Sequence, residues 1–513
     1  MRYFPEIIRI LDRFREPRIE TIDTGFRKRR EDKSFQLYEG IKTGNFKNDA
    51  VAAAALYDGE EADTRYSSLK NRLKGRMLNS LFHLNLRRAG YSEHAQAVYT
   101  CRKKSYYAHI LIALGARNAG VRMAHRTLVL AERYQFVDIS LEMALLLRTN
   151  ASISDKTALY NEYDTLLKSA LRQFEAECTS WELFDRAQSV LSRKSGERGK
   201  NANLLKTYTQ QLRSLLSDDS SFTFRLNYYR LRAMSLGTSG EHLRLVATCE
   251  EALSYFRSVP HLAQKPRLGE FYLLKLQSYT AAKDYSMAKE TALEIPTLFG
   301  YGSNNWFSFA QDYFILLMNT LDFAQANDLY AEASLHPRFA LQDETAKERW
   351  MIYELYLHYA LRRTPSYENA ELRTKFDLSR FLTTVPTAAK DKHGLNVAML
   401  IGHVLYMIDG GDFSGINNRI EALTTYRVRY LRVTDNPQSN LFFKLLRVME
   451  NTSFRYERAL EAGDRYYQEL RTIRPAIVHL EEELQIIPYA WLWEQILLKL
   501  REFKIEGKLL LGE

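Results

Sequence analysis

The order of apolar and polar residues predicts helices over almost the whole chain. Apolar residues recur every three or four positions over long windows, which is the spacing of one helix face. The clearest stripe lies between Arg65 and Leu86 and contains Tyr66, Leu69, Leu73, Met77, Leu81 and Leu84. Residues 91–114, 120–134 and 344–361 follow the same period, and we find no alternating β-branched run closed by a hairpin turn. The chain is therefore expected to be all-α.

Short breaks separate the predicted helices. They carry Gly, Pro, Asp or Ser and lie near residues 90, 118–120, 218–221, 237–240, 300–304 and 409–412. Because short connections join helices that run antiparallel, successive helices are expected to form hairpins.

Four breaks share a pattern: a polar residue, then Tyr or Phe, then a small or aliphatic residue three positions further on. They are Asp284-Tyr285 with Ala288, Asp322-Phe323 with Ala326, Asp412-Phe413 with Ile416, and more weakly Gln135-Phe136 with Ile139. A fifth break, Ser453-Phe454, has the aromatic residue without the small one. The spacing of the breaks indicates an irregular period of roughly 38–45 residues, which is typical of repeated two-helix units.

The segment Tyr279–Ala292 resembles the turn between the two helices of a tetratricopeptide (TPR) repeat. Tyr279 and Ala288 have the spacing of that family, and Ala292 follows four residues later. The family's Trp-Leu-Gly positions are occupied by Tyr272, Lys275 and Leu276. The resemblance implies a TPR-like right-handed α-solenoid of stacked antiparallel helix hairpins, since one hairpin cannot bury its apolar face alone. An irregular globular bundle is the alternative fold.

Charge divides the chain unevenly. The whole chain has a net charge of +10. Residues 1–110 hold 22 Lys and Arg against 14 Asp and Glu, a net of +8, so the remainder carries +2. The sequence therefore predicts a basic helical N-terminal module at 1–110, a helical-repeat solenoid at 111–475, and a C-terminal apolar helix and tail at 476–513. Such an asymmetry points to an acidic partner for the first part.

Two groups of basic residues are candidate contacts for nucleic acid or another acidic partner. Arg27, Lys28, Arg29 and Arg30 form the densest charge cluster. The second group is Lys70, Arg72, Lys74 and Arg76 on a long basic helix over 63–88. A short Ala-rich helix at 48–57 precedes it, with a longer connection than the turn of a helix-turn-helix reader. A solvated linker and ordinary surface charge are the alternatives. The layout also resembles bacterial regulators that join a DNA-binding head to a TPR-like sensor body.

Tyrosine is frequent, with 32 residues. The candidate groove residues are Tyr228, Tyr229, Tyr353, Tyr356 and Tyr359, because Tyr and Arg dominate binding hot spots. Packing between helices, with the hydroxyl at a wet edge, is the alternative interpretation.

The last predicted helix, Ile486–Leu500, is apolar nearly all round. Tyr489, Trp493, Ile496 and Leu500 form one stripe, while Trp491, Leu492 and Leu498 lie outside it. Burial on more than one side is therefore expected. The helix either docks within the chain or supports self-association through Trp491–Leu500.

Signatures of catalysis are absent. We find no GxxxxGK[ST], GxGxxG, GxSxG or HExxH motif, and Cys101, Cys178 and Cys249 form no paired or clustered set. The longest apolar run, Val397–Ile408, is too short to span a bilayer, and no secretory signal is recognised, so a cytoplasmic location without membrane contact is expected. The sequence predicts a non-enzymatic scaffold without cofactor or metal that binds a protein or peptide on a concave face. The alternative is a nucleic-acid-binding regulator.

Overall fold

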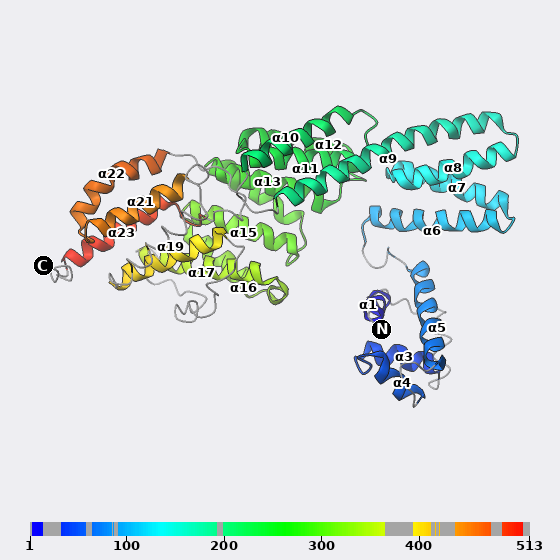
Figure 1. Cartoon of the computed structure of the whole chain (residues 1–513), viewed down its shortest axis with the longest axis horizontal. Helices are drawn as coiled ribbons and strands as arrows, with labels where there is room; N and C mark the ends of the chain where they lie inside the picture. Colours follow the sequence, from blue (N-terminus) through cyan, green and yellow to red (C-terminus); the bar gives the residue numbers. More distant parts are fainter. Residues whose placement is uncertain are drawn as a thin grey trace. The chain divides into compact units, whose positions relative to one another are not determined.

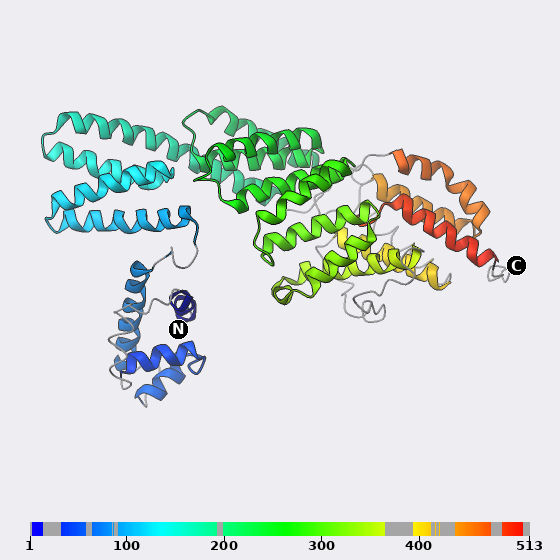
Figure 2. The ribbon, with the colours of Figure 1, turned by 180° about the vertical axis from the view of Figure 1, so that it is seen from behind.

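The structure is a computed structural model of the chain (Figures 1 and 2). It describes residues 3–13, 32–57, 64–84, 86, 91–191, 198–364, 393–411, 416, 420, 437–472 and 485–505. Over these ranges every regular element is a helix and no strand occurs. The prediction of an all-α chain is therefore confirmed for the part that the structure describes.

The chain divides into two compact units, Met1–Glu175 and Ala176–Glu513. The division falls inside the long helix α9, Thr157–Leu191, and not at the boundaries near 110 and 475 that the sequence suggested. The predicted C-terminal helix belongs to the second unit.

The first unit contains two groups of helices. Its elements are α1 (Phe4–Arg13), α3 (Lys33–Lys42), α4 (Asp49–Tyr57), α5 (Thr64–Ser80), the 3₁₀ turn η1 (Leu81–His83), α6 (Glu93–Ala113), α7 (Arg117–Arg133), α8 (Val137–Ile153) and the start of α9. Helices α1 to α5 share one apolar core, which the predicted stripe of α5 enters with Tyr66, Leu69, Leu73 and Met77. Helices α6 to α9 share another. Helix α5 ends at Ser80, eight residues earlier than predicted.

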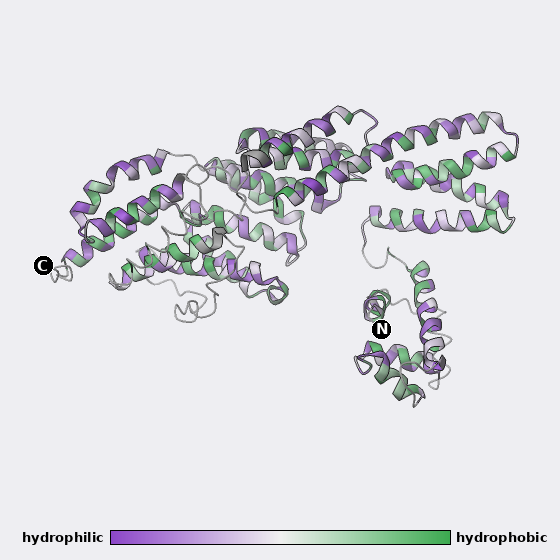
Figure 3. Cartoon of the chain, viewed as in Figure 1, coloured by the Kyte–Doolittle hydropathy of each residue, from purple (hydrophilic) through white to green (hydrophobic). Residues whose placement is uncertain are grey.

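The second unit is built on one continuous apolar core. Its helices are α10 (Arg198–Leu215), α11 (Phe222–Thr238), α12 (His242–Ser258), α13 (Lys265–Ala281), α14 (Tyr285–Glu294), α15 (Asn304–Asn319), α16 (Phe323–Ser334), α17 (Glu344–Arg363), α19 (His393–Gly410), α21 (Pro437–Asn451), α22 (Tyr456–Thr472) and α23 (Tyr489–Ile505), with the 3₁₀ turns η3 (Ile295–Thr297) and η4 (Pro337–Leu341). Most helices that are consecutive in the chain pack together, and α13 also contacts α15, as α21 does α23. Apolar and polar residues mix along most helices (Figure 3).

One tight turn recurs between consecutive helices. At six connections a single residue adopts the left-handed conformation: Gly115, Gln135, Asp155, Gly240, Lys283 and Leu321. The next residue donates its backbone N–H to a carbonyl five residues back, as Asp284 does to Tyr279 and Asp322 to Leu317, both at 2.9 Å. This is the Schellman arrangement of helix ends. Because backbone groups make these bonds, the turn forms with residues as different as Gly, Gln and Leu at the left-handed position.

The fourth residue of the helix after the turn is small where the helices approach closely. Ala288 and Ala326 are fully buried, as the shared pattern predicted, and Asp284 and Asp322 accept N-cap hydrogen bonds. Gly120 takes this place in α7, where a Cβ atom would lie 2.5 Å from Cγ1 of Ile112. The predicted break at 118–120 is therefore wrong: these residues are helical, and the turn is at Gly115.

Two junctions have a different register from the predicted one. At Gln135 the residues equivalent to Tyr285 and Ala288 are Val137 and Ser140, because Gln135 itself is the left-handed residue. The turn at Ser453 has one extra residue, since both Ser453 and Phe454 have positive φ, and the equivalent pair is Tyr456 with the buried Ala459. Asp412 and Phe413 lie outside the described residues.

Candidate interaction surfaces

Lys70, one of the predicted basic contacts, is half-buried and pairs with a carboxylate of the first group of helices. Its ammonium nitrogen lies 2.8 Å from Oδ1 of Asp49, and the Tyr66 hydroxyl donates to the same oxygen at 2.7 Å. Burial alone would raise the pKa of Asp49, but the hydrogen bonds from Lys70 and Tyr66 hold it at about 2. Lys70 therefore ties α5 to α4 through Asp49, and its side chain is 28% exposed.

Of the other three predicted contacts on α5, one packs against an aromatic ring and two lie at the surface. Lys74 is half-buried, with its ammonium group 5.2 Å from the centre of the Tyr3 ring. Arg72 and Arg76 are exposed on α5. The cluster Arg27, Lys28, Arg29 and Arg30 lies outside the described residues, as does the connection 58–63 between α4 and α5.

The net charge follows the structural division. Residues 1–175 contain 30 Lys and Arg against 21 Asp and Glu, a net of +9. Residues 176–513 contain the remaining 42 and 41, a net of +1. The first unit thus carries nine of the ten net charges, including α7, whose four arginines Arg117, Arg122, Arg126 and Arg133 are all exposed.

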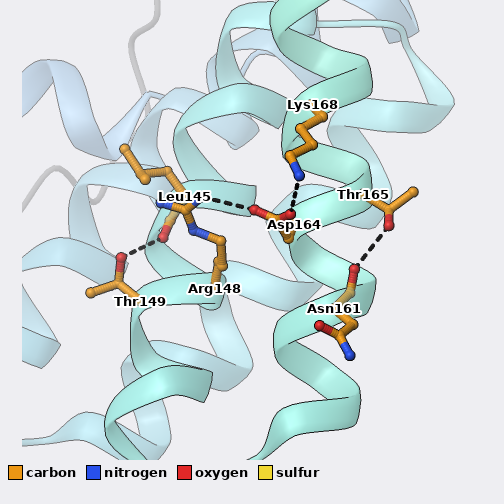
Figure 4. A network of polar contacts seen from close by, with 7 residues as sticks. All are labelled: Leu145, Arg148, Thr149, Asn161, Asp164, Thr165 and Lys168. Atoms are coloured by element: carbon orange, nitrogen blue, oxygen red, sulfur yellow. Dashed lines mark hydrogen bonds and ion pairs between the residues drawn. The ribbon is translucent and has the colours of Figure 1, made fainter.

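Ion pairs within the first unit hold its helices together. The guanidinium of Arg148 on α8 donates to Asp164 on α9 at 2.9 Å, and Lys168 contacts the other carboxylate oxygen at 2.7 Å (Figure 4). The hydrogen bonds from these two cations lower the pKa of Asp164. Thr149 and Thr165 beside this pair donate to carbonyl groups of their own helices. The network fixes α8 against α9 and leaves one positive charge in excess, since two cations share the single carboxylate of Asp164.

All five tyrosines proposed for a groove are buried. Tyr353 stacks on Phe314 with ring centroids 4.7 Å apart, and the Tyr356 hydroxyl donates to the carbonyl oxygen of Ala398 at 2.7 Å. The remaining three, Tyr228, Tyr229 and Tyr359, also belong to the core of the second unit. The structure therefore corrects the prediction that these rings face a partner: they fill space between helices.

Polar side chains bridge alternate helices of the second unit. Arg230 on α11 makes two hydrogen bonds to Glu270 on α13, at 2.8 and 2.5 Å. The Gln277 amide on α13 donates to Asp312 on α15 at 2.9 Å, and Arg349 on α17 donates to Gln311 on α15 at 3.1 Å. These bridges join the first helix of each hairpin to the first helix of the next.

Among these bridging residues, Asp312 has the pKa that departs furthest from its ordinary value. It is only 6% exposed. Burial raises its pKa to about 7, although the hydrogen bond from Gln277 and the charge of Arg349 act in the opposite direction. Nε of Arg349 and the hydroxyl of Tyr353 are buried beside it without a hydrogen-bond partner among the described residues. Polar residues within an otherwise apolar helix are the one sequence signal that points to this cluster.

The last helix docks within the second unit. The predicted stripe of Tyr489, Trp493, Ile496 and Leu500 is buried, and α23 packs on α19, α21 and α22. Trp491 contacts Phe323 and Tyr359, with ring centroids 5.4 and 6.4 Å apart. Intramolecular docking, one of the two alternatives for this segment, is therefore what the structure contains.

Reactive and metal-binding groups are sparse in the part of the chain that is described. Burial raises the pKa of the Cys101 thiol to about 11 and that of Cys249 to about 12, while Cys178 is exposed. Among the described residues, no three His, Cys, Asp or Glu side chains are grouped so as to hold a metal ion. No described helix is long and apolar enough to cross a membrane.

Comparison with protein-family models, with curated proteins and with solved structures finds no match for this chain.

Proposed function

We propose that this chain is a non-enzymatic helical-repeat scaffold, a TPR-like α-solenoid that binds a protein partner. The recurring hairpin turn carries the proposal. Its left-handed residue and its buried small residue recur at Lys283 and Leu321 with Ala288 and Ala326, at the period expected of stacked units. Bridges such as Arg230–Glu270 between alternate helices support serial stacking. Stacked repeats generate extended surfaces, which such proteins use for partners.

The residues that meet a protein partner must be other than the five buried tyrosines. Large exposed apolar side chains on the second helices of successive hairpins are the better candidates. Leu293 on α14 and Leu335 at the end of α16 are 75% and 73% exposed. Because neither side chain contributes to the core, their replacement leaves the fold intact.

Chemical cross-linking in cells that express the chain, followed by affinity purification and mass spectrometry, tests the scaffold proposal. We expect a protein recovered in near-equal amount, with cross-links to the second unit, and a lower yield from the L293S/L335S double variant. The exposed substitution Glu290→Gln on α14 is the control. Recovery of the chain without a cross-linked partner, or equal recovery with the double variant, would contradict the proposal.

A second candidate function is binding of nucleic acid by the first unit. It is favoured by the concentration of nine of the ten net charges in residues 1–175, together with exposed Arg72 and Arg76 on α5. Binding to phosphates releases counterions, so the affinity must fall steeply as salt rises.

Fluorescence anisotropy with a labelled 20-base-pair duplex between 50 and 200 mM salt tests this second candidate. We expect binding that weakens along a straight line in a plot of log affinity against log salt, and a shallower line for R72Q/R76Q. Absence of binding by the full chain at 50 mM salt would exclude it.

A further inference from the structure

Helix α7 presents a basic surface that is distinct from the contacts predicted on α5. Its sequence contains four arginines and a single acidic residue, Glu132. At 100° per residue, Arg122, Arg126 and Arg133 fall within an arc of about 40°, whereas Glu132 lies about 80–120° away from them around the helix. All three arginines are exposed. With a rise of 1.5 Å per residue, they span about 16 Å along one face.

The two carboxylates of the neighbouring helix α8 are engaged by side chains of α6. Asp138 of α8 pairs with Arg102 of α6, and Glu142 of α8 accepts hydrogen bonds from Ser105 at 2.9 Å and contacts His109 at 2.8 Å. These contacts join α8 to α6. None of the ion pairs found among the described residues joins a carboxylate to Arg122 or Arg126.

The arginines are positioned for an incoming anion. Nε of Arg122 donates to the carbonyl of Asn118 in its own helix at 3.3 Å, which directs the side chain along the surface. The guanidinium of Arg133 lies 5.7 Å from the centre of the Tyr134 ring, which limits its rotamers. Arginine forks match phosphate oxygens in pairs, so three of them in a row suit a repeating phosphate chain.

The chemistry of the α7 strip, formed by Arg122, Arg126 and Arg133, favours a duplex over a single strand as the ligand. Proteins that hold single strands combine basic grooves with exposed aromatic side chains on which bases stack. Helix α7 has no Phe, Tyr or Trp, and Val129 is the apolar side chain exposed between the arginines. Phosphates of one duplex strand rise 3.4 Å each along the axis, so a 16 Å strip spans about five of them.

We propose that Arg122, Arg126 and Arg133 of α7 bind the phosphate backbone of duplex nucleic acid without regard to base sequence. This inference deepens the second candidate function and rests on it. It adds a second anchor to the first unit, separate from Arg72 and Arg76 of α5.

The test measures duplex binding by fluorescence anisotropy across 50–200 mM salt with the full chain and three variants. They are R122Q/R126Q/R133Q, the α5 variant R72Q/R76Q, and a control, K47Q/K156Q/R172Q, that removes the same charge from exposed sites elsewhere in the first unit. We expect the α7 variant to lose up to about 2.7 from the slope of log affinity against log salt, roughly 0.9 per phosphate contact. The control should lose clearly less, and all variants should keep the wild-type circular dichroism.

The outcomes separate this inference from the function on which it rests. If the α7 variant keeps the wild-type slope while the α5 variant loses affinity, the α7 strip is not a contact and nucleic-acid binding stands. If the wild-type chain binds no duplex, both are overturned. If the α7 variant and the charge control lose the same amount of slope, the effect comes from net charge alone, and the inference is overturned. Tighter binding of polyglutamate or of a single-stranded oligonucleotide than of the duplex would overturn it as well.

Discussion

Replacing Asp312 by Asn should make the second unit more stable at neutral pH. Asp312 is buried between α13 and α17 and accepts a hydrogen bond from Gln277, which an Asn side chain can still accept through its oxygen. The carboxyl has a pKa of about 7 in the folded chain against 3.8 when unperturbed. Between pH 3.8 and about pH 7, the folded state therefore holds a proton on Asp312 that the unfolded state has released.

The sign and size of the effect follow from that difference. Because the unfolded state binds fewer protons, stability falls as pH rises from about 4 to 7 and then levels off. One pKa unit corresponds to 1.36 kcal/mol, so the penalty reaches about 4 kcal/mol above pH 7. The Asn variant has no such penalty. Its advantage over the wild type should grow by roughly 2–3 kcal/mol between pH 5 and pH 8.

Tryptophan fluorescence reports this change selectively. All five tryptophans, Trp181, Trp306, Trp350, Trp491 and Trp493, belong to the second unit, so urea unfolding followed by their emission senses that unit alone. Asp164→Asn in the first unit is the control and should leave the tryptophan-detected curve unchanged at both pH values. Burial raises the pKa of the neighbouring Tyr353, so its hydroxyl does not titrate between pH 5 and pH 8. An equal difference between wild type and D312N at pH 5 and pH 8 would refute the reasoning.

Three further predictions concern the packing of helices and turns. Gly120→Ala should destabilise the first unit by about 1–3 kcal/mol in circular dichroism melts, because the new Cβ would meet Ile112 and the Ala108 carbonyl. Gly75→Ala, in open space on α5, should instead stabilise the unit by about 0.5–1 kcal/mol. An effect of the same sign for both variants would contradict the close approach of α7 to α6 at Gly120. Leu321→Gly should stabilise the second unit by roughly 1 kcal/mol, since Leu is strained at φ 59°, and a loss of stability would count against a left-handed turn. Tyr356→Phe should lower the free energy of unfolding by about 1 kcal/mol, because the hydrogen bond to the Ala398 carbonyl is lost. Tyr353→Phe should leave it unchanged, because the Tyr353 hydroxyl has no partner among the described residues. Equal losses of stability in the two variants would show that the Tyr353 hydroxyl is bonded.

Features that repeat locally could be predicted from the sequence. The stripe of α5 and that of α23 each keep one helical period over several turns, and the structure buries both. The junctions at Asp284 and Asp322 could be found because an N-cap, an aromatic residue and a small residue coincide there. These signals arise within about ten residues of chain, so they need no knowledge of the partner helix.

Features that depend on the partner helix were mispredicted. Tyr353 and Tyr356 look like binding residues because tyrosine serves equally well in cores and at surfaces, and only the helices around them decide which. The ion pair of Lys70 with Asp49 could not be foreseen either, because Asp49 lies on another helix. At Gln135 the alignment on Phe136 was one residue off, because the turn is defined by a backbone angle that several residue types can adopt.

The polar bridges of the second unit favour one order of stacking. Arg230 is the ninth residue of α11 and meets Glu270, the sixth of α13; Asp312 and Arg349 occupy the same two places in α15 and α17, with the charges reversed. At the intervening step these places hold Leu273 and Phe309, so no charge is needed there. If α11 stacked on α17, Arg230 would face Arg349, and if α15 stacked on α13 in the wrong sense, Asp312 would face Glu270. Like charges brought together at these partly buried places repel each other, so the alternating signs oppose misordered hairpins. Burial raises the pKa of Asp312, and this destabilising effect is the cost of keeping an acid at that place between the helices.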